Sequence, residues 1–200
     1  MITSHSLYFE HTFEHTFEVN LAGQTFSHCE FEQCEFIDCD FSHSQFENCR
    51  FIECEFKNCN LVALGLKYTS LEEVSFKACK LTSVRFTDVD WPLLATRAPV
   101  SFIGCELSHS SFFELSLKAL KMRSCFAKDV DFRHADLSSA DFTDTDFRDS
   151  VFQQTNLSKA NFIGASHFAI DITANNISKA KFERYAALDL LAGLDIELVD

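Results

Sequence analysis

Large apolar residues recur at every fifth position of the chain, from Phe26 to Trp91 and again from Phe102 to Phe182. A period of five fits neither an α-helix, with about 3.6 residues per turn, nor a strand, which alternates every second residue. We name this position i. Nearly all residues at i are Phe, Leu, Ile or another apolar type, and His167 is the only polar one in the second tract. The spacing therefore predicts a backbone that turns once in every five residues.

A second pattern of small residues lies two positions earlier, at i−2. Cysteine dominates it in the first half of the chain, as at Cys29 and Cys54, and alanine, serine or threonine in the second half. The remaining three positions of each unit are mostly charged or polar. Two residues in five are thus expected to point inward, a large one and a small one. A repeat at a fixed period is typical of a solenoid architecture.

Units such as CEFEQ, CEFID, CRFIE, ADLSS and ADFTD resemble the pentapeptide-repeat family, and the resemblance covers about residues 20–182. It implies an all-β fold, a right-handed quadrilateral β-helix in which each unit forms one side of a square and four units form one coil. The handedness is implied by the resemblance alone.

Side-chain packing is consistent with such a solenoid. A narrow central column accepts a large side chain at i only beside a small one at i−2, if successive coils are to stack at strand spacing. Backbone hydrogen bonds then run between coils, and each coil contacts only its neighbours. The repeats predict about 8 coils and, at ~4.8 Å per coil, a rod roughly 40 Å long.

One continuous pattern indicates a single domain over 1–200. We expect an N-terminal cap at 1–20, a first repeat tract at 21–91, a break at 92–101 and a second tract at 102–182. The break lies between Pro92 and Pro99 and has two interpretations: one extra residue bulges near Thr96, or six residues form a loop.

Residues 183–200 are expected to form a short helix, ERYAALDLLA, followed by a strand in LDIELV. The predicted strand alternates apolar and acidic residues, and an apolar edge at a rod end is a candidate dimer surface. Related family members pair through this end, which favours a homodimer; the alternative is a lid on the last coil. The candidate dimerisation residues are Leu190, Leu191, Leu194, Ile196 and Leu198.

All nine cysteines lie at i−2, the position that requires a small buried residue. Thiols behave as small hydrophobic groups, so we interpret them as reduced core residues. Their spacing does not fit a zinc site, and pairs one coil apart, such as Cys29 and Cys49, are rather widely separated for a relaxed disulfide. Abundant free thiol, with neither a signal peptide nor a long apolar run, predicts a cytoplasmic protein and no membrane association.

The net charge is −13, and residues 1–91, with 15 acids against 6 bases, supply −9 of it. This charge favours a basic partner and disfavours direct binding to nucleic acid. Residues one coil apart share a face, so Glu35 with Glu55 and Glu53 with Glu73 become like-charge neighbours, whereas Glu30 and Arg50 offset each other. The alternative is that each acidic cluster is simply a soluble face. The candidate partner-binding residues are Glu35, Glu53, Glu55, Glu73, Asp131, Asp141, Pro92, Arg97 and Pro99.

Catalytic chemistry is not indicated by any motif. The eight histidines are scattered, no phosphate-binding or nucleophile motif occurs, and a stacked rod offers faces rather than clefts. His11 and His15 would form a metal pair only if their segment were helical, and a capping strand or loop is favoured instead. At the irregular coil near His167, Phe168 is the alternative inward residue. We therefore expect no enzyme activity, no cofactor and no metal.

The resemblance extends to the topoisomerase-protecting branch of the family, which includes quinolone- and albicidin-resistance proteins. It is carried by Trp91-Pro92, by SFIGCELSHSSFF after the break, and by FIGASHFAIDITANNISKAKF leading to LDIELVD. This likeness implies a non-enzymatic DNA mimic that binds DNA gyrase or topoisomerase IV and protects it from poisons. The long projecting loops of typical quinolone-resistance members are missing, which favours the albicidin type. The alternative function is a scaffolding repeat protein with an unrelated cytoplasmic partner.

Overall fold

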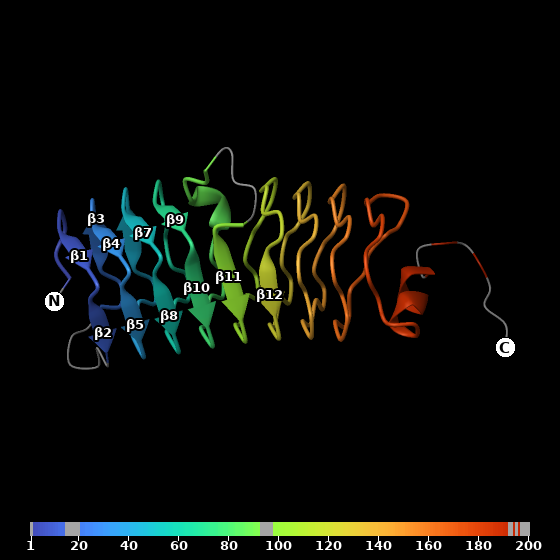
Figure 1. Cartoon of the computed structure of the whole chain (residues 1–200), viewed down its shortest axis with the longest axis horizontal. Helices are drawn as coiled ribbons and strands as arrows, with labels where there is room; N and C mark the ends of the chain where they lie inside the picture. The colour runs from blue at the N-terminus through green and yellow to red at the C-terminus, as the bar shows by residue number, and fades with distance from the viewer. Residues whose placement is uncertain (1, 15–20, 93–97, 192–193, 195, 197–200) are drawn as a thin grey trace.

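The chain forms a straight rod, with the N-terminal strands at one end and the C-terminal helix at the other (Figure 1). This computed structural model describes residues 2–14, 21–92, 98–191, 194 and 196. The described residues form a parallel β-solenoid with little helix, as the repeat predicts. No helix within these ranges is long and apolar enough to cross a membrane.

The strands are short, and each centres on one inward residue. Their bounds are β1 Leu7–Phe9, β2 Thr12–Glu14, β3 Thr25–Ser27, β4 Glu30–Glu32, β5 Glu35–Ile37, β6 Gln45–Glu47, β7 Arg50–Ile52, β8 Glu55–Lys57, β9 Ser70–Glu72, β10 Val74–Lys77, β11 Val100–Ile103 and β12 Lys121–Arg123. Two 3₁₀ helices, η2 Phe86–Asp88 and η3 Ala186–Leu191, complete the elements. In β5, for example, Phe36 is fully buried between two half-buried neighbours.

The corners of the coil lie two residues after each inward position. There the backbone adopts positive φ, for example 53° at Gln33 and 51° at Glu53. Residues other than glycine, asparagine and aspartate adopt a positive φ at a cost of about 1 kcal/mol or more each. Packing of the inward side chains must offset that cost, since the corners repeat along the whole rod.

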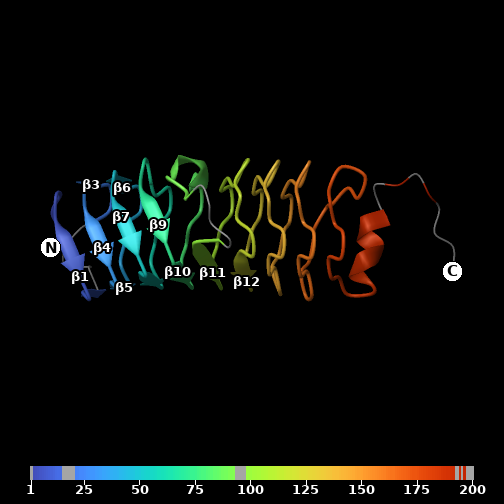
Figure 2. The ribbon, with the colours of Figure 1, turned by 45° about the horizontal axis from the view of Figure 1, so that its top comes forward.

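The strands pair in parallel with the strand one coil later. One four-stranded sheet runs β1-β4-β7-β9, a six-stranded sheet runs β12-β11-β10-β8-β5-β2, and β3 pairs with β6 (Figures 1 and 2). On the side of the six-stranded sheet the pairing continues as bridges to the C-terminal end. Its nine successive rungs are Thr12, Glu35, Glu55, Ser75, Ser101, Lys121, Asp141, Asn161 and Lys181. Their eight spacings agree with the rod length expected from the repeats.

The pairing across the break decides between its two interpretations. Phe36 pairs with Phe56 and Phe56 with Phe76, but Phe76 then pairs with Phe102 rather than with position 96. The stretch between Trp91 and Phe102 therefore contains six residues more than one regular unit, and the one-residue bulge is wrong. Trp91 stays half-buried, and its indole Nε1 donates to the carbonyl oxygen of Phe86 at 2.8 Å.

The N-terminal segment continues the solenoid by one more coil. Strands β1 and β2 pair with β4 and β5, and Phe13 is in register with Phe36 rather than with position 33. The expected cap at 1–20 thus contributes regular rungs, and the three additional residues hide them from a strict period of five. His11 is exposed next to a strand rather than on a helix, and His15 lies outside the described residues.

The interior is a column of stacked aromatic rings flanked by thiols. Phe31 stacks on Phe51 with centroids 4.7 Å apart, and Phe36 on Phe56 at 4.4 Å. All nine cysteines are buried free thiols, and the Cys54 Sγ donates to the Phe31 carbonyl oxygen at 3.3 Å. Burial raises the pKa of Cys54 to about 12, so the thiol is protonated near neutral pH.

The C-terminal coils depart from the pattern in two places. Phe168 is buried, whereas His167 is exposed and reaches Asp146 Oδ1 at 2.9 Å, so Phe168 takes the inward place. The expected helix is the 3₁₀ helix η3, with Leu190 packed into the core of the rod. Leu194 and Ile196 do not lie in a strand, and the other residues of the predicted strand lie outside the described residues.

Truncating one ring of the stack tests the packing column. Phe36 is fully buried between Phe13 and Phe56, so Phe36→Ala should lower the free energy of unfolding by about 3–5 kcal/mol. Phe126 is 63% exposed, and Phe126→Ala should change it by less than about 0.5 kcal/mol. Chemical denaturation of both variants measures the difference, and equal effects would contradict the stacked core.

Candidate protein-binding surface

Two stacked glutamates mark one corner of the N-terminal half. Glu53 and Glu73 are exposed corner residues of successive coils, with φ of 51° and 54°. Consecutive coils lie about 4.8 Å apart, so the two carboxylates are held as like-charge neighbours, as the sequence predicts. Gln33, one coil earlier, donates from Nε2 to Glu53 Oε2 at 2.9 Å and fixes that carboxylate.

Glu35 and Glu55 are also in register, but two lysines neutralise them. Lys57 Nζ lies 3.5 Å from Glu35 Oε1 and 3.0 Å from Glu55 Oε1, and Lys77 Nζ lies 2.8 Å from Glu55 Oε2. Burial alone would raise the pKa of Glu55, but the hydrogen bonds from Lys77 and Lys57 outweigh it and lower the pKa. These lysines were not among the residues predicted from the sequence, although they too are one coil apart and share the face.

Arg50 selects a different partner from the one expected. It is in register with Glu30, yet its guanidinium Nη2 lies 3.1 Å from Glu72 Oε1, on the next coil. The long side chain of Arg50 reaches the next coil and two residues further along its strand. Glu30 has no ion pair to a described residue. The predicted Glu30–Arg50 offset is therefore wrong.

Asp131 and Asp141 do not form one patch. Asp131 pairs in register with Ser111 and Val151, and Asp141 with Lys121 and Asn161. Two repeat units separate them and correspond to two sides of the square, so the two carboxylates lie on opposite sides of the rod. Each has its own cation: Arg133 Nη2 lies 2.8 Å from Asp131 Oδ2, and Arg123 Nε donates to Asp141 Oδ2 at 2.6 Å.

The hydrogen bond from Arg133 is the largest cause that lowers the pKa of Asp131. At Asp141, burial opposes the charged form, but hydrogen bonds from Thr143 and Arg123 still lower the pKa. Both carboxylates are thus engaged within the chain and offer little free charge to a partner.

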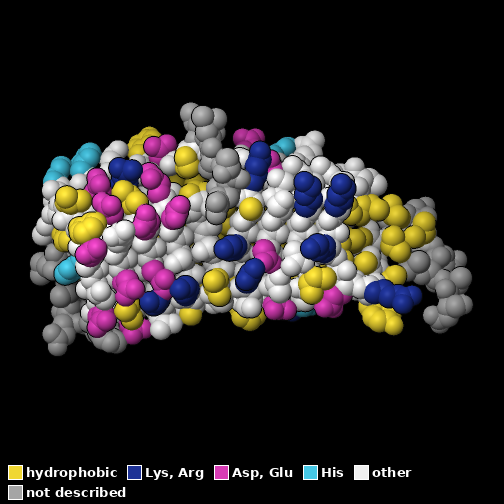
Figure 3. All heavy atoms as spheres, in the orientation of Figure 1, with side chains coloured by type: hydrophobic (Ala, Val, Ile, Leu, Met, Phe, Trp, Pro, Cys, Tyr) yellow, Lys and Arg dark blue, Asp and Glu magenta, His cyan; other side chains and the backbone are white. Residues whose placement is uncertain are grey.

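Five acids of the N-terminal half lie on the side built from β4, β7 and β9 and on the adjoining corner. We call this surface the acidic face, and its residues are Glu30, Glu32, Glu53, Glu72 and Glu73. Among them only Glu72 has an ion pair to a described residue, with Arg50. The space-filling view shows acidic side chains gathered over this N-terminal half and lysines and arginines over the C-terminal half of the same side (Figure 3).

The break and the C-terminal candidates are placed as follows. Pro92 is exposed and Pro99 half-buried, while Arg97 lies outside the described residues. Leu190 is buried, Leu191 and Leu194 are half-buried and Ile196 is 54% exposed. Leu198 lies outside the described residues. Near this end Tyr185 and Leu188 are 82% and 50% exposed, and neither was among the residues predicted from the sequence.

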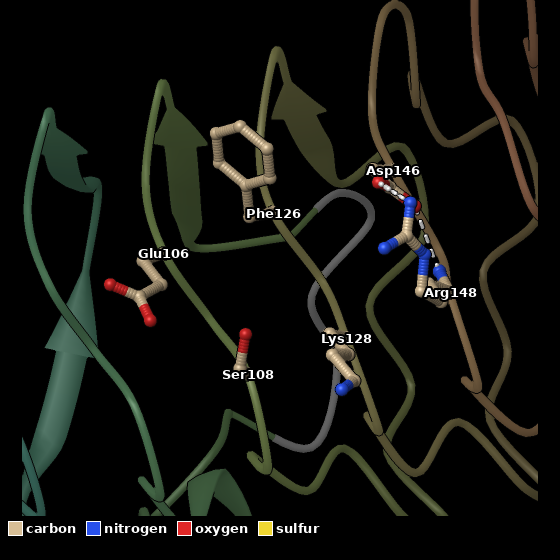
Figure 4. A pocket seen from close by; sticks show the side chains of 6 residues that line it. All are labelled: Glu106, Ser108, Phe126, Lys128, Asp146 and Arg148. Carbon is tan, nitrogen blue, oxygen red and sulfur yellow. Dashed lines mark hydrogen bonds and ion pairs between the residues drawn. The ribbon is translucent and has the colours of Figure 1, made fainter.

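A shallow groove of about 320 Å³ lies on another side of the rod, between Glu106, Ser108, Phe126, Lys128, Asp146 and Arg148 (Figure 4). Its charges are largely satisfied, since Asp146 contacts Arg148 at 3.6 Å and His167 at 2.9 Å. Across the described ranges, no three His, Cys, Asp or Glu side chains are arranged to hold a metal ion.

Two family models match this solenoid. "Pentapeptide repeat region" matches residues 29–97 and "Pentapeptide repeats (8 copies)" matches residues 128–164, together just over half of the chain. The chain belongs to the pentapeptide-repeat family.

Among solved structures, the chain is similar to a trypsin-treated variant of QnrB1, a plasmid-mediated fluoroquinolone resistance protein. The TM-score is 0.53 at 16% identity, covering 98% of this chain and 99% of that chain. It is also matched to HetL of the cyanobacterium Nostoc sp. strain PCC 7120, with a TM-score of 0.27 at 16% identity, covering 89% and 84%. No curated protein sequence matches. At such identities the likeness to QnrB1 shows the fold alone.

The ion pairs of Lys57 and Lys77 with Glu55 predict how the stability of the fold depends on pH. Lys77→Met removes the 2.8 Å ion pair, so the pKa of Glu55 should rise. A lowered carboxylate pKa stabilises the fold above the unfolded value near 4.5, and that stabilisation is lost as the pH falls through the folded value. Carboxyl-carbon NMR titration measures the shift. Lys80→Met is the control: it removes a weaker ion pair, with Glu106 at 3.9 Å, and should leave the pKa of Glu55 unchanged.

Proposed function

We propose that this protein is a non-enzymatic, DNA-mimicking binder of DNA gyrase or topoisomerase IV that protects the enzyme from poisons. The observation that carries the proposal is the stack of exposed carboxylates at Glu53 and Glu73 on a rigid rod. The acidic face has a regular row of carboxylates along the rod, and a groove that binds duplex phosphates through its positive charge would attract such a row.

The charge density supports this shape argument. The net charge of −13 over a rod of roughly 40 Å is about 0.3 charge per Å, against about 0.6 per Å of duplex DNA. A basic protein groove built for DNA would attract the rod, and the attraction would weaken at high salt. The likeness of the fold to QnrB1 is compatible with the proposal.

The sequence likeness favours the albicidin-resistance type within the topoisomerase-protecting branch. Trp91 and Pro92, the last described residues before the break, lie at the end of the side that contains the acidic face. We assign Glu53, Glu73, Pro92 and Pro99 to the contact surface, and Glu35 and Glu55 to its edge. Asp131 and Asp141 are excluded from a single contact surface because they lie on opposite sides.

A supercoiling assay tests the proposal directly. The wild-type chain at micromolar concentration should restore gyrase supercoiling in the presence of albicidin or ciprofloxacin, or inhibit the enzyme at excess. Glu53→Lys with Glu73→Lys should weaken this effect at least about tenfold, since like charges then face the basic groove.

The matched control reverses two exposed acids elsewhere, Glu114→Lys with Asp149→Lys, which makes the same change in net charge. This control should keep its activity. A wild-type chain without rescue or inhibition would refute the proposal, and a lysate capture that lacks gyrase and topoisomerase IV subunits would then favour a scaffolding role with another cytoplasmic partner.

We also propose that two copies pair end to end through the C-terminal segment around Leu190, Leu191, Leu194, Ile196 and Leu198. Leu190 lies in the core and holds η3 on the last coil, so the contact itself would come from the exposed side of the segment.

Replacing two exposed residues there, Leu188→Asp with Ile196→Asp, should convert an end-to-end dimer into monomers because it places charge in an apolar contact. Light scattering after size exclusion measures the mass. Tyr68→Asp, at a 64% exposed position in the N-terminal half, serves as the control and should not change the mass. A wild-type monomer would refute end-to-end pairing.

A further inference from the structure

One corner of the rod reverses its charge along its length. It is the corner between the side of β4, β7 and β9 and the side of the six-stranded sheet. Its successive coils place one residue each at this edge. After Glu10 and Gln33, the seven positions toward the C-terminal end are Glu53, Glu73, Pro99, Ala119, Ser139, Lys159 and Lys179. Two acids thus lie at one end, two lysines at the other, and small or neutral residues between them. We name these seven positions the charged edge.

The charges of this edge cannot neutralise each other within one chain. Glu73 and Lys159 are four rungs apart, about 19 Å at strand spacing and about twice the Debye length at physiological salt. Lys159 and Lys179 have no ion pair to any residue in the described part of the chain. Each lysine instead has another lysine as its nearest neighbour on the edge, an unfavourable arrangement that an opposite charge from outside would relieve.

The order of the charges is self-complementary under a two-fold axis. Ala119 is the middle position, so an antiparallel second copy, turned about an axis through it, places Glu53 opposite Lys179 and Glu73 opposite Lys159. Symmetry repeats both pairs, which gives four ion pairs. A parallel copy would instead place acid against acid, and a shift by one rung leaves only one acid–lysine pairing per half, Glu53 with Lys159 or Glu73 with Lys179.

The neighbouring row of the six-stranded sheet obeys the same rule. Its seven rungs run from Glu55 to Lys181 with Lys121 in the middle, so Glu55, which Lys57 and Lys77 of its own chain already pair, faces Lys181 of a second copy. Lys121 of one copy would face Lys121 of the other at the axis, and Asp141, one rung away, already pairs with Arg123 of its own chain, so this row adds less than the charged edge.

We infer that a second copy of this chain docks on this edge, antiparallel and side by side, with the two-fold axis at Ala119. The small residues in the middle, Ala119 and Ser139, allow the two corners to approach. This contact is separate from the end-to-end pairing, and it engages the same Glu53 and Glu73 carboxylates as the proposed function, so a chain in this dimer would not offer them to a basic groove. Charge reversal along one side is visible in Figure 3, where the acidic and basic halves of the same side face the viewer.

Sedimentation velocity tests the contact in the Leu188→Asp, Ile196→Asp background, which removes end-to-end pairing. At about 50 mM salt the chain should form dimers that dissociate at about 500 mM, because the Debye length shortens severalfold. Glu53→Lys with Glu73→Lys, and separately Lys159→Glu with Lys179→Glu, should each weaken the dimer at least about tenfold.

Mixing the two double variants gives the decisive result. One then carries lysine at all four positions and the other glutamate, so the mixture should form a heterodimer although neither variant pairs with itself. A mixture that stays monomeric, or a wild-type chain that is monomeric at low salt, would overturn the inference.

Lys67→Glu with Lys128→Glu is the control for Lys159→Glu with Lys179→Glu. It makes the same change in net charge on other sides of the rod and should keep the dimer. An equal loss in this control would also overturn the inference, because only net charge would then matter. Circular dichroism of each exposed-site variant verifies that the solenoid is intact.

Discussion

The whole structure depends on the fit of a large side chain at i beside a small one at i−2. A ring such as Phe56 fills the column only because the corners are lined by residues no larger than Cys54 or Cys59. That fit keeps successive coils at strand spacing, so backbone groups pair between coils and rings stack along the axis. The positive-φ corners are strained, and the continuous core compensates for them.

This packing also decides how charge is displayed. Four units make one coil, so acids one unit apart in sequence lie on different sides, whereas acids one coil apart stack. The aspartates from Asp131 to Asp146 form a dense acidic run in the sequence but encircle the rod, most of them with a cation nearby. Glu53 and Glu73 are far apart in the sequence and yet form the exposed pair. Patches on a solenoid are properties of columns rather than of sequence segments.

The repeat made most of the fold predictable, because a fixed period assigns every residue to a side. The stacking of Glu35 on Glu55 and the burial of all nine thiols follow from it. The first coil escaped because three additional residues separate Phe13 and Phe36 beyond one regular coil. The break was ambiguous until the pairing of Phe76 with Phe102 counted six extra residues.

Side-chain partners were less predictable than backbone register. Arg50 lies beside Glu30 but reaches Glu72, since a long side chain can select diagonal partners at nearly equal energy. Lys57 and Lys77 neutralise Glu55 for the same reason. The predicted C-terminal strand is wrong at Leu194 and Ile196 because alternation alone supplies no neighbouring strand to pair with.

The most direct test of the column geometry is a pulsed electron-spin distance between labels introduced as non-canonical amino acids at positions 53 and 179. Six coil spacings separate these corner residues, so we predict backbone points about 29 Å apart and a single narrow distribution after allowance for label length. A broad distribution, or a distance shorter by more than two coil spacings, would show that the coils do not stack as one continuous column.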